Sequence, residues 1–154
     1  MNHEQAMLAQ RDASAFHNGC SRCGEVGIET RIVEDNFQYG VGDEAVSLRV
    51  EVPLRICAKC GFEFLDDEAE DIRHVAVCRH LGVMTPTEIQ RLRDRLQLTE
   101  AEFARITRLG PATVSRWERG ASVQNAAYDQ YLYLLSFPEN VERLKSRVTP
   151  STSP

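Results

Sequence analysis

Four of the five cysteines form two pairs with identical spacing. Cys20 and Cys23 enclose two residues, as do Cys57 and Cys60, and 33 residues separate the pairs. Two such CxxC knuckles can present four sulfurs tetrahedrally, the coordination that zinc accepts in structural sites. The sequence therefore predicts one structural Zn²⁺ per chain, bound by these four cysteines. Iron in a rubredoxin-like site is the alternative.

Redox and catalytic chemistry fit this pattern less well. A redox CxxC motif normally occurs singly and opens a helix in a βαβ unit. Four thiolates also leave no open coordination position for a catalytic zinc. His17 and the group His74, Cys78 and His80 are further possible ligands, although ordinary surface or helix positions are the simpler interpretation. No Ser/His/Asp or paired-carboxylate pattern supports catalysis, so we expect no enzymatic activity. A thiol oxidoreductase or metalloenzyme is the disfavoured class.

Charge is distributed unevenly along the chain. Residues 1–82 hold 8 basic against 15 acidic residues, a net charge of −7, whereas residues 83–154 hold 10 against 8, a net of +2. This asymmetry predicts two modules with different partners. Four arginines between residues 105 and 119 oppose only Glu118, and this local excess indicates where a polyanion would bind. These arginines are Arg105, Arg108, Arg116 and Arg119.

The segments between and after the cysteine pairs predict a hairpin and a helix. Apolar and polar residues alternate over 46–56, which is typical of a half-buried strand, and Pro53 within it indicates an edge strand. A partner strand is expected over 29–39, with a turn at 40–43. An acidic run at 66–68 then opens a helix that ends near Leu81, before Gly82.

The second half of the chain predicts five short helices. Thr85 and Thr99 each begin a capping box, with glutamate three residues later. A third helix begins at Gly110-Pro111 and ends at Gly120, a fourth spans about 125–136, and a fifth spans about 139–146. The expected fold class is therefore α+β, with a small four-cysteine zinc-binding β-hairpin module joined by a helix to an all-α five-helix domain.

This pattern divides the chain into five expected parts. They are an N-terminal extension (1–18), a zinc-binding module (19–66), a connector helix (67–82), a helix-turn-helix DNA-binding and dimerisation domain (83–148), and a disordered tail (149–154). No apolar run is long enough for a transmembrane helix, and the N-terminus lacks the apolar core of a signal peptide. We therefore expect a cytoplasmic protein without a membrane partner.

Residues 99–120 predict a helix-turn-helix that binds double-stranded DNA. An advance of about 100° per residue places Val114 and Trp117 on one side of the third helix. The small and cationic residues on its other side suit a major groove, where arginine binds guanine. Arg116 is the best candidate for a base contact, and the other residues are expected mainly at phosphates. The predicted DNA-binding set is Arg116, Arg119, Ser115, Thr113, Arg105 and Thr99. An ordinary helix surface is the alternative.

The last two predicted helices are unusually rich in apolar residues. They hold more than one buried stripe needs, which favours a homodimer interface in the C-terminal domain, with simple core packing as the alternative. The expected interface residues are Tyr128, Tyr131, Leu132 and Leu135. A two-fold dimer would bind a palindrome whose half-sites lie about 34 Å apart.

The order of these parts resembles the MqsA family of antitoxins, which join a YgiT-type zinc finger to an XRE (Cro/CI-type) helix-turn-helix. The resemblance covers about residues 20–146. It rests on the four-cysteine module and on the segments Leu98–Ala104, LTEAEFA, and Val114–Gly120, VSRWERG. Its specific parts are the cysteine spacing and the segment SRWERG (115–120).

The resemblance implies an antitoxin of a type II toxin-antitoxin system. The zinc module would neutralise a small ribonuclease toxin, and the dimeric C-terminal domain would repress the operon by binding operator DNA. The four paired cysteines match the family's zinc ligands, and Arg116 matches its DNA-reading arginine. Ala112 replaces the family's base-reading asparagine and Glu100 an expected glutamine, so the operator sequence stays open. A stand-alone zinc-finger helix-turn-helix transcriptional regulator without a toxin partner is the alternative.

Overall fold

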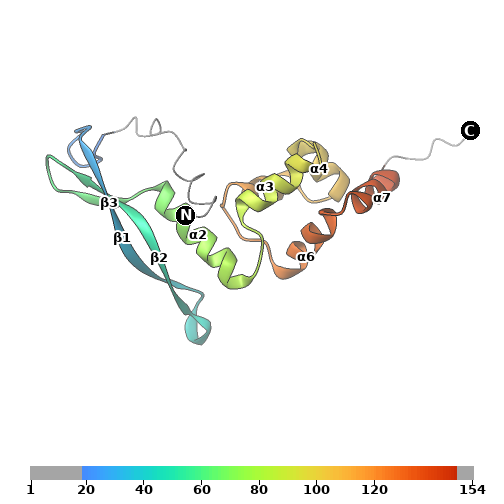
Figure 1. Ribbon diagram of the computed structural model, residues 1–154, viewed down its shortest axis with the longest axis horizontal. Coiled ribbons are helices and arrows are strands. Elements are labelled where there is room, and N and C mark those ends of the chain that lie inside the picture. Colours follow the sequence, from blue (N-terminus) through green and yellow to red (C-terminus); the bar gives the residue numbers. More distant parts are fainter. Residues whose placement is uncertain (1–18, 149–154) are drawn as a thin grey trace, which may run out of the picture. The chain divides into compact units, whose positions relative to one another are not determined.

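The computed structural model describes residues 19–148, which form an α+β structure as expected (Figure 1). The described residues contain one three-stranded sheet and six α-helices. They form two compact units. The cysteine-bearing unit comprises the described residues up to Glu34 together with Glu51–Ala69. The helical unit comprises Asp35–Val50 together with the described residues from Glu70 onward. The N-terminal extension, the C-terminal tail and His17 lie outside the described residues.

The sheet has the strand order β1-β2-β3. Strands β1 (Ile28–Tyr39) and β2 (Val46–Cys57) form the predicted hairpin, whose turn contains the short 3₁₀ helix η2 (Gly42–Glu44). The third strand, β3 (Glu63–Leu65), pairs antiparallel with β2 and adds to the hairpin that the sequence predicted.

The prediction that Pro53 marks an edge strand is wrong, because β2 lies between β1 and β3. Pairing with β3 covers only Leu54 to Ile56, so it begins one residue after the proline. Pro53 therefore keeps the one-sided environment in which a strand tolerates a residue without a backbone N–H.

Helix α2 (Asp67–Leu81) ends at Gly82, as the sequence predicted. Gly82 has a φ of 68°, the left-handed conformation that glycine adopts readily. Its amide donates to the carbonyl of Arg79, and the amide of Val83 donates to the carbonyl of Cys78. These two bonds form a Schellman motif, which satisfies the last carbonyls of the helix.

Five further helices follow, as expected for the second half. They are α3 (Pro86–Arg95), α4 (Glu100–Thr107), α5 (Pro111–Glu118), α6 (Ala126–Leu135) and α7 (Pro138–Val148). Both predicted capping boxes are present, at Thr85 and Thr99. With α2, the described residues contain six α-helices, one more than the five that the sequence analysis assigned to the C-terminal domain.

These five helices enclose one apolar core. Its residues come from every helix of the group, and Phe103, Val114 and Leu132 are completely buried in it. Among the described residues, no helix combines the length and the apolar character that crossing a membrane would require.

Candidate metal centre and nucleic-acid interface

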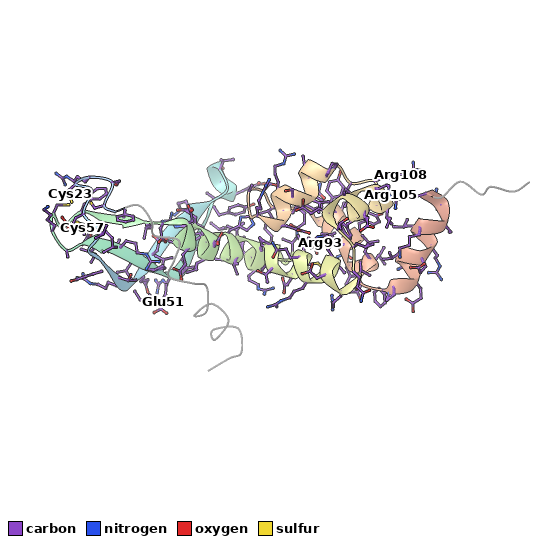
Figure 2. The ribbon with its side chains drawn as sticks, turned by 90° about the horizontal axis from the view of Figure 1, so that it is seen from above. Cys23, Glu51, Cys57, Arg93, Arg105 and Arg108 are labelled. Atoms are coloured by element: carbon purple, nitrogen blue, oxygen red, sulfur yellow. The ribbon has the colours of Figure 1, made fainter. Side chains whose placement is uncertain are left out.

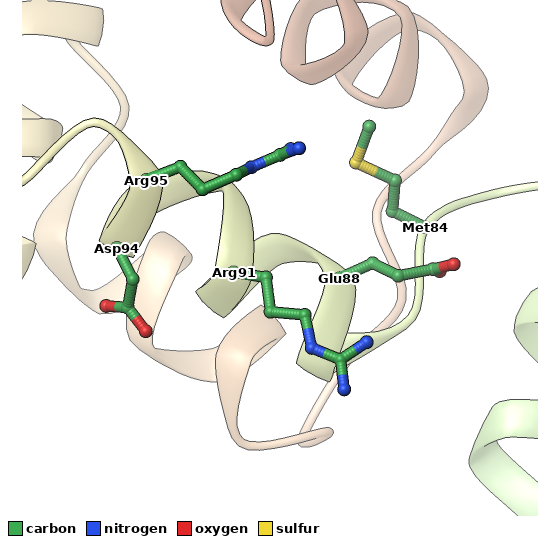
Figure 3. A pocket seen from close by; sticks show the side chains of 5 residues that line it. All are labelled: Met84, Glu88, Arg91, Asp94 and Arg95. Carbon is green, nitrogen blue, oxygen red and sulfur yellow. The ribbon is translucent and has the colours of Figure 1, made fainter. Parts of the chain in front are cut away.

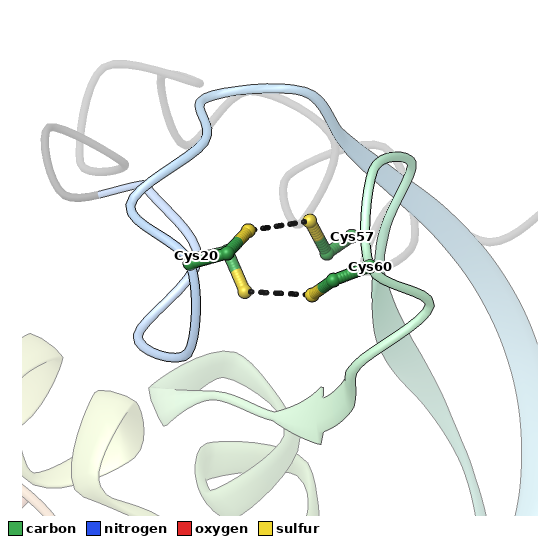
Figure 4. A group of neighbouring side chains, drawn as sticks. Cys20, Cys57 and Cys60 are labelled. Atoms are coloured by element: carbon green, nitrogen blue, oxygen red, sulfur yellow. Dashed lines mark hydrogen bonds between the residues drawn. The ribbon is translucent and has the colours of Figure 1, made fainter.

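The two cysteine knuckles bring their four sulfurs together. All four Sγ atoms lie within 4.8 Å of one another, and Figure 4 shows the sulfurs of the two loops facing each other. The Sγ atoms of Cys20 and Cys60 are 3.6 Å apart, as are those of Cys23 and Cys57. A disulfide would need about 2.05 Å. Zinc with four thiolates at about 2.3 Å has sulfurs about 3.8 Å apart, so the cluster fits such an ion.

Each knuckle is closed by the same backbone hydrogen bond. The amide of Gly24 donates to the carbonyl of Cys20 at 2.7 Å, and the amide of Gly61 donates to that of Cys57 at 2.9 Å. Both glycines have positive φ, 75° and 70°. The local sequence C-x-x-C-G therefore builds the same turn twice, and each turn directs two sulfurs toward the other knuckle.

The electrostatics of the cluster favour a cation. A hydrogen bond from the backbone of Cys60 is the main cause that lowers the pKa of Cys57 to about 7. At Cys23, a backbone hydrogen bond from Glu25 opposes the shift, but burial and hydrogen bonds with the other three cysteines raise the pKa to about 12. The raised pKa favours the protonated form of Cys23, and a divalent cation that bound this sulfur would displace the proton.

Of the alternative ligands in the sequence analysis, the three that the structure describes, His74, Cys78 and His80, do not join the four-sulfur cluster. Cys78 is completely buried in α2, and the ring of His80 meets that of Tyr39 edge to face at 6.3 Å. His74 has a buried Nε2 without a hydrogen-bond partner in the described residues. Among these residues, the four paired cysteines are the group of ligating side chains close enough to share one ion.

Helices α4 and α5 are joined by a short turn at 108–110. Val114 and Trp117 are buried in the core with Phe103 and Ile106, as the helical periodicity predicted. The turn begins at Arg108, whose φ of 58° is left-handed. Figure 2 shows Arg105 and Arg108 close together on α4 and at its C-terminal end.

The predicted DNA-contacting arginines are all exposed. Arg105 lies on α4, Arg116 on the outer face of α5, and Arg119 at the C-terminal cap of α5. The Nε of Arg116 donates to the carbonyl of Ala112 at 3.2 Å, so this side chain lies along its own helix.

The other predicted DNA contacts are less accessible or already engaged. Ser115 and Thr113 are half-buried. The hydroxyl of Thr99 donates to the carboxylate of Glu102 at 2.8 Å and accepts from its backbone amide, so it serves the capping box. Glu100 is exposed at the first position of α4.

The predicted dimer residues occupy different environments. Leu132 and Leu135 are buried in the core of their own chain. Tyr131 is half-buried, and its hydroxyl donates to the carbonyl of Thr107 at 3.1 Å. Tyr128 is 43% exposed, with its ring 5.3 Å from that of Trp117. The large apolar side chains that α6 and the next turn expose besides Tyr128 are Tyr133, Leu134 and Phe137.

Glu118 is a residue whose environment the sequence analysis missed. It was counted as a charge opposing the arginines, but its side chain is only 3% exposed and pairs with Arg93. Helical periodicity contained a signal for this, because Glu118 follows Val114 by four residues and Arg93 follows Ile89 by four. Both charged residues therefore share the buried faces of their helices.

A shallow hollow of about 510 Å³ lies along α3 (Figure 3). Its lining balances two arginines with two carboxylates, and Glu88 already serves the capping box at Thr85. The hollow therefore shows no preference for an anionic or cationic ligand. Its lining residues are Met84, Glu88, Arg91, Asp94 and Arg95.

Comparison with known protein families places the whole arrangement in one family. The family described as the antitoxin component of a bacterial toxin-antitoxin system, MqsA, matches residues 18–145. No curated protein matches the chain. The match includes both cysteine pairs, helices α3 to α6, and α7 as far as residue 145. The chain therefore belongs to the MqsA family of bacterial antitoxins.

Proposed function

We propose that this antitoxin neutralises a ribonuclease toxin through its zinc module and represses its own operon as a DNA-binding dimer. The family match, joined to a four-sulfur cluster in one unit and an arginine-bearing helix in the other, is the observation that carries this proposal. The predicted boundaries assign toxin capture to residues 19–66 and DNA binding with dimerisation to residues 83–148. The cluster is proposed to hold one structural Zn²⁺.

The cysteine-bearing unit has the charge to meet a basic toxin. Its described residues contain eight acidic and four basic side chains. One of the four, Arg55, is buried and paired with Asp66 and Glu68. Val26 and Ile32 are 81% and 62% exposed and would supply apolar contacts. A negative surface favours both the encounter with a cationic partner and its selection.

The arginine-bearing face of α5 has the composition that suits a major groove. Arg116 is exposed in the middle of the helix, beside the small side chains of Ala112 and Ser115. Arginine donates two hydrogen bonds to O6 and N7 of guanine, which discriminates against the other bases. We expect Arg105 and Arg119, which are both exposed, to contact phosphates and set the position of the helix.

The exposed apolar residues of α6 support dimerisation. Tyr133 and Leu134 are each 51% exposed and Phe137 is 44% exposed, and the rings of Tyr133 and Phe137 are 5.5 Å apart. We place the dimer interface on these residues together with Tyr128, whereas Leu132 and Leu135 support it from the core. Replacing Leu134 with Glu should shift sedimentation at micromolar concentration from dimer to monomer. A monomeric wild-type protein would overturn the dimer.

Coexpression tests toxin neutralisation. We expect a small basic protein to be encoded beside this chain, to arrest growth and cleave RNA when expressed alone, and to do neither when the antitoxin is present. The two should copurify. A protein that binds operator DNA but has no such partner would instead be the stand-alone regulator.

Gel-shift titrations test DNA binding. Arg116→Ala should abolish the preference for DNA from upstream of the operon, whereas Arg105→Ala should weaken binding to all sequences alike. Equal retention of preference in both variants would remove α5 from the major groove.

A further inference from the structure

A buried ion pair joins α3 to the C-terminal end of α5. The Nε of Arg93 lies 2.7 Å from Oε1 of Glu118, and its Nη2 lies 3.0 Å from Oε2. The side chain of Glu118 is 3% exposed and that of Arg93 is 17% exposed. Two parallel charge-assisted hydrogen bonds from a planar guanidinium define both the distance and the orientation of the partners.

Two further hydrogen bonds connect α3 to the segment before α4 and to α5. The Nη1 of Arg93 donates to the carbonyl of Leu98 at 2.9 Å, immediately before the N-cap of α4. The side-chain amide of Gln90 donates to the backbone carbonyl of Glu118 at 3.1 Å. The guanidinium of Arg93 on α3 therefore contacts both the segment before α4 and the end of α5.

Burial of Glu118 also changes the charge that α5 presents. Glu118 lies between Arg116 and Arg119 in the sequence, and an exposed carboxylate there would repel DNA phosphates. In the structure its charge is turned into the core and neutralised by Arg93, whereas both neighbouring arginines are exposed. The outer face of α5 is therefore more cationic than its sequence indicates.

We propose that Arg93 and Glu118 are positioning residues for DNA recognition, which hold α5 at the rotation and axial position that direct Arg116 to a base edge. This inference rests on the proposed DNA binding by α5. Contacts to base edges require hydrogen-bond geometry within a few tenths of an ångström, whereas flexible arginines reach phosphates from many positions. Loosening α5 should therefore lower the preference for the operator more than it lowers binding to unrelated DNA.

Two variants separate positioning from stability. Glu118→Gln keeps the shape of the side chain but removes its charge. The double variant R93M/E118L replaces the ion pair with apolar side chains, a change that buried pairs often tolerate without loss of stability. Glu142→Gln is the matched control, because it removes one negative charge and an exposed ion pair with Lys145.

The measured quantity is the ratio of affinities for upstream operon DNA and for unrelated DNA of equal length. We expect both variants to lower this ratio at least about tenfold, and the control to leave it unchanged. Thermal unfolding and zinc content report whether each variant is folded.

The outcomes distinguish this inference from the proposed function. A wild-type protein without preference for the upstream DNA would contradict the proposed DNA binding itself. If the wild type shows the preference and folded R93M/E118L keeps the same ratio, the ion pair is structural only and the positioning role is overturned. If the double variant does not fold, an unchanged ratio in Glu118→Gln overturns it.

Discussion

The cysteine-bearing unit and the helical unit differ in how much apolar surface they bury. The helical unit encloses a cluster of eleven buried residues, with Phe103 and Leu132 at 0% exposure. In the cysteine-bearing unit, the buried apolar side chains include Val52 and Ala69 together with two of the cysteines, Cys20 and Cys57. A module this small buries little apolar surface of its own, and the proposed structural metal would supply the missing free energy. We therefore infer that the cysteine-bearing unit depends on the proposed ion for its stability, whereas the helical unit depends on its apolar core.

Of all the changes predicted here, removal of the metal should destabilise one unit most. Stripping the metal with a chelator, or replacing Cys57 with Ser, should unfold the cysteine-bearing unit, because structural zinc contributes on the order of 10 kcal/mol to folding. The helical unit should keep its structure. Two-dimensional NMR spectra would show the loss of dispersed signals from one unit only.

Cys78→Ala is the control for metal removal, because this buried cysteine lies outside the four-sulfur cluster. It should leave the metal content unchanged. Loss of the helical signals on chelation would contradict the independence of the two units.

Arg55→Met should have the next largest effect. Arg55 is 7% exposed and donates to Asp66, Glu68 and Thr30, each at 2.6 Å. Removing one partner of a buried ion pair leaves the other uncompensated and costs about 3 kcal/mol. Chemical denaturation of the cysteine-bearing unit measures this loss. Lys59→Met breaks the exposed pair with Glu25 and should cost less than about 1 kcal/mol.

Loss of the cap of α3 should lower stability less than loss of Arg55 does. Thr85→Ala removes a buried hydroxyl that accepts from the amide of Glu88, so we expect a loss of about 1–2 kcal/mol in the helical unit. Thr99→Ala, at the exposed cap of α4, should cost about 1 kcal/mol or less. Thermal unfolding of both variants tests this order, and a larger loss at Thr99 would contradict it.

Glu88 makes the α3 cap sensitive to acid. Burial alone would raise the pKa of Glu88, but hydrogen bonds from Thr85 and Arg79 outweigh it and lower the pKa below 4.5. Its stabilising contribution is therefore complete above pH 4.5 and is lost as the pH falls through the lowered pKa. In Glu88→Gln, the stability of the helical unit should therefore fall less as the pH is lowered. An unchanged fall in stability at acidic pH would contradict the role of this carboxylate.

Arg108→Gly should have the smallest effect, and its sign is opposite. Arg108 has a φ of 58°, where a side chain costs about 1–2 kcal/mol that glycine avoids. After the greater entropy of glycine in the unfolded chain is subtracted, we expect a gain of about 0.5–1 kcal/mol. Gln97→Gly, at a φ of 55°, repeats the test at a second left-handed residue and should also stabilise the protein. Destabilisation of both variants in thermal unfolding would contradict this account.

Local elements were the most predictable part of the protein. Both capping boxes, the glycine that ends α2 and the hairpin between the cysteine pairs occur where the sequence predicted them. Residues only a few positions apart form each of these features. The third strand was not predicted as part of the sheet, because three residues carry too little periodicity to indicate a partner.

Burial was harder to predict than secondary structure. Leu132 and Leu135 were expected at a dimer interface but are buried in their own chain, whereas Tyr133 and Leu134 are exposed. When a helix is apolar on all sides, its sequence does not indicate which face the neighbouring helices cover. The face is chosen by the packing of α6 against the other helices.

The residue types and their spacing were sufficient to define the four-sulfur site, the helix caps and the family, because each depends on short-range geometry or on a motif. The environments of Arg55, Arg93 and Glu118 depended on how distant elements pack, since a charged side chain is buried only where another segment supplies its partner. Packing of α3 against α5 thus buries Glu118 beside Arg93, whereas its sequence neighbours Arg116 and Arg119 stay exposed.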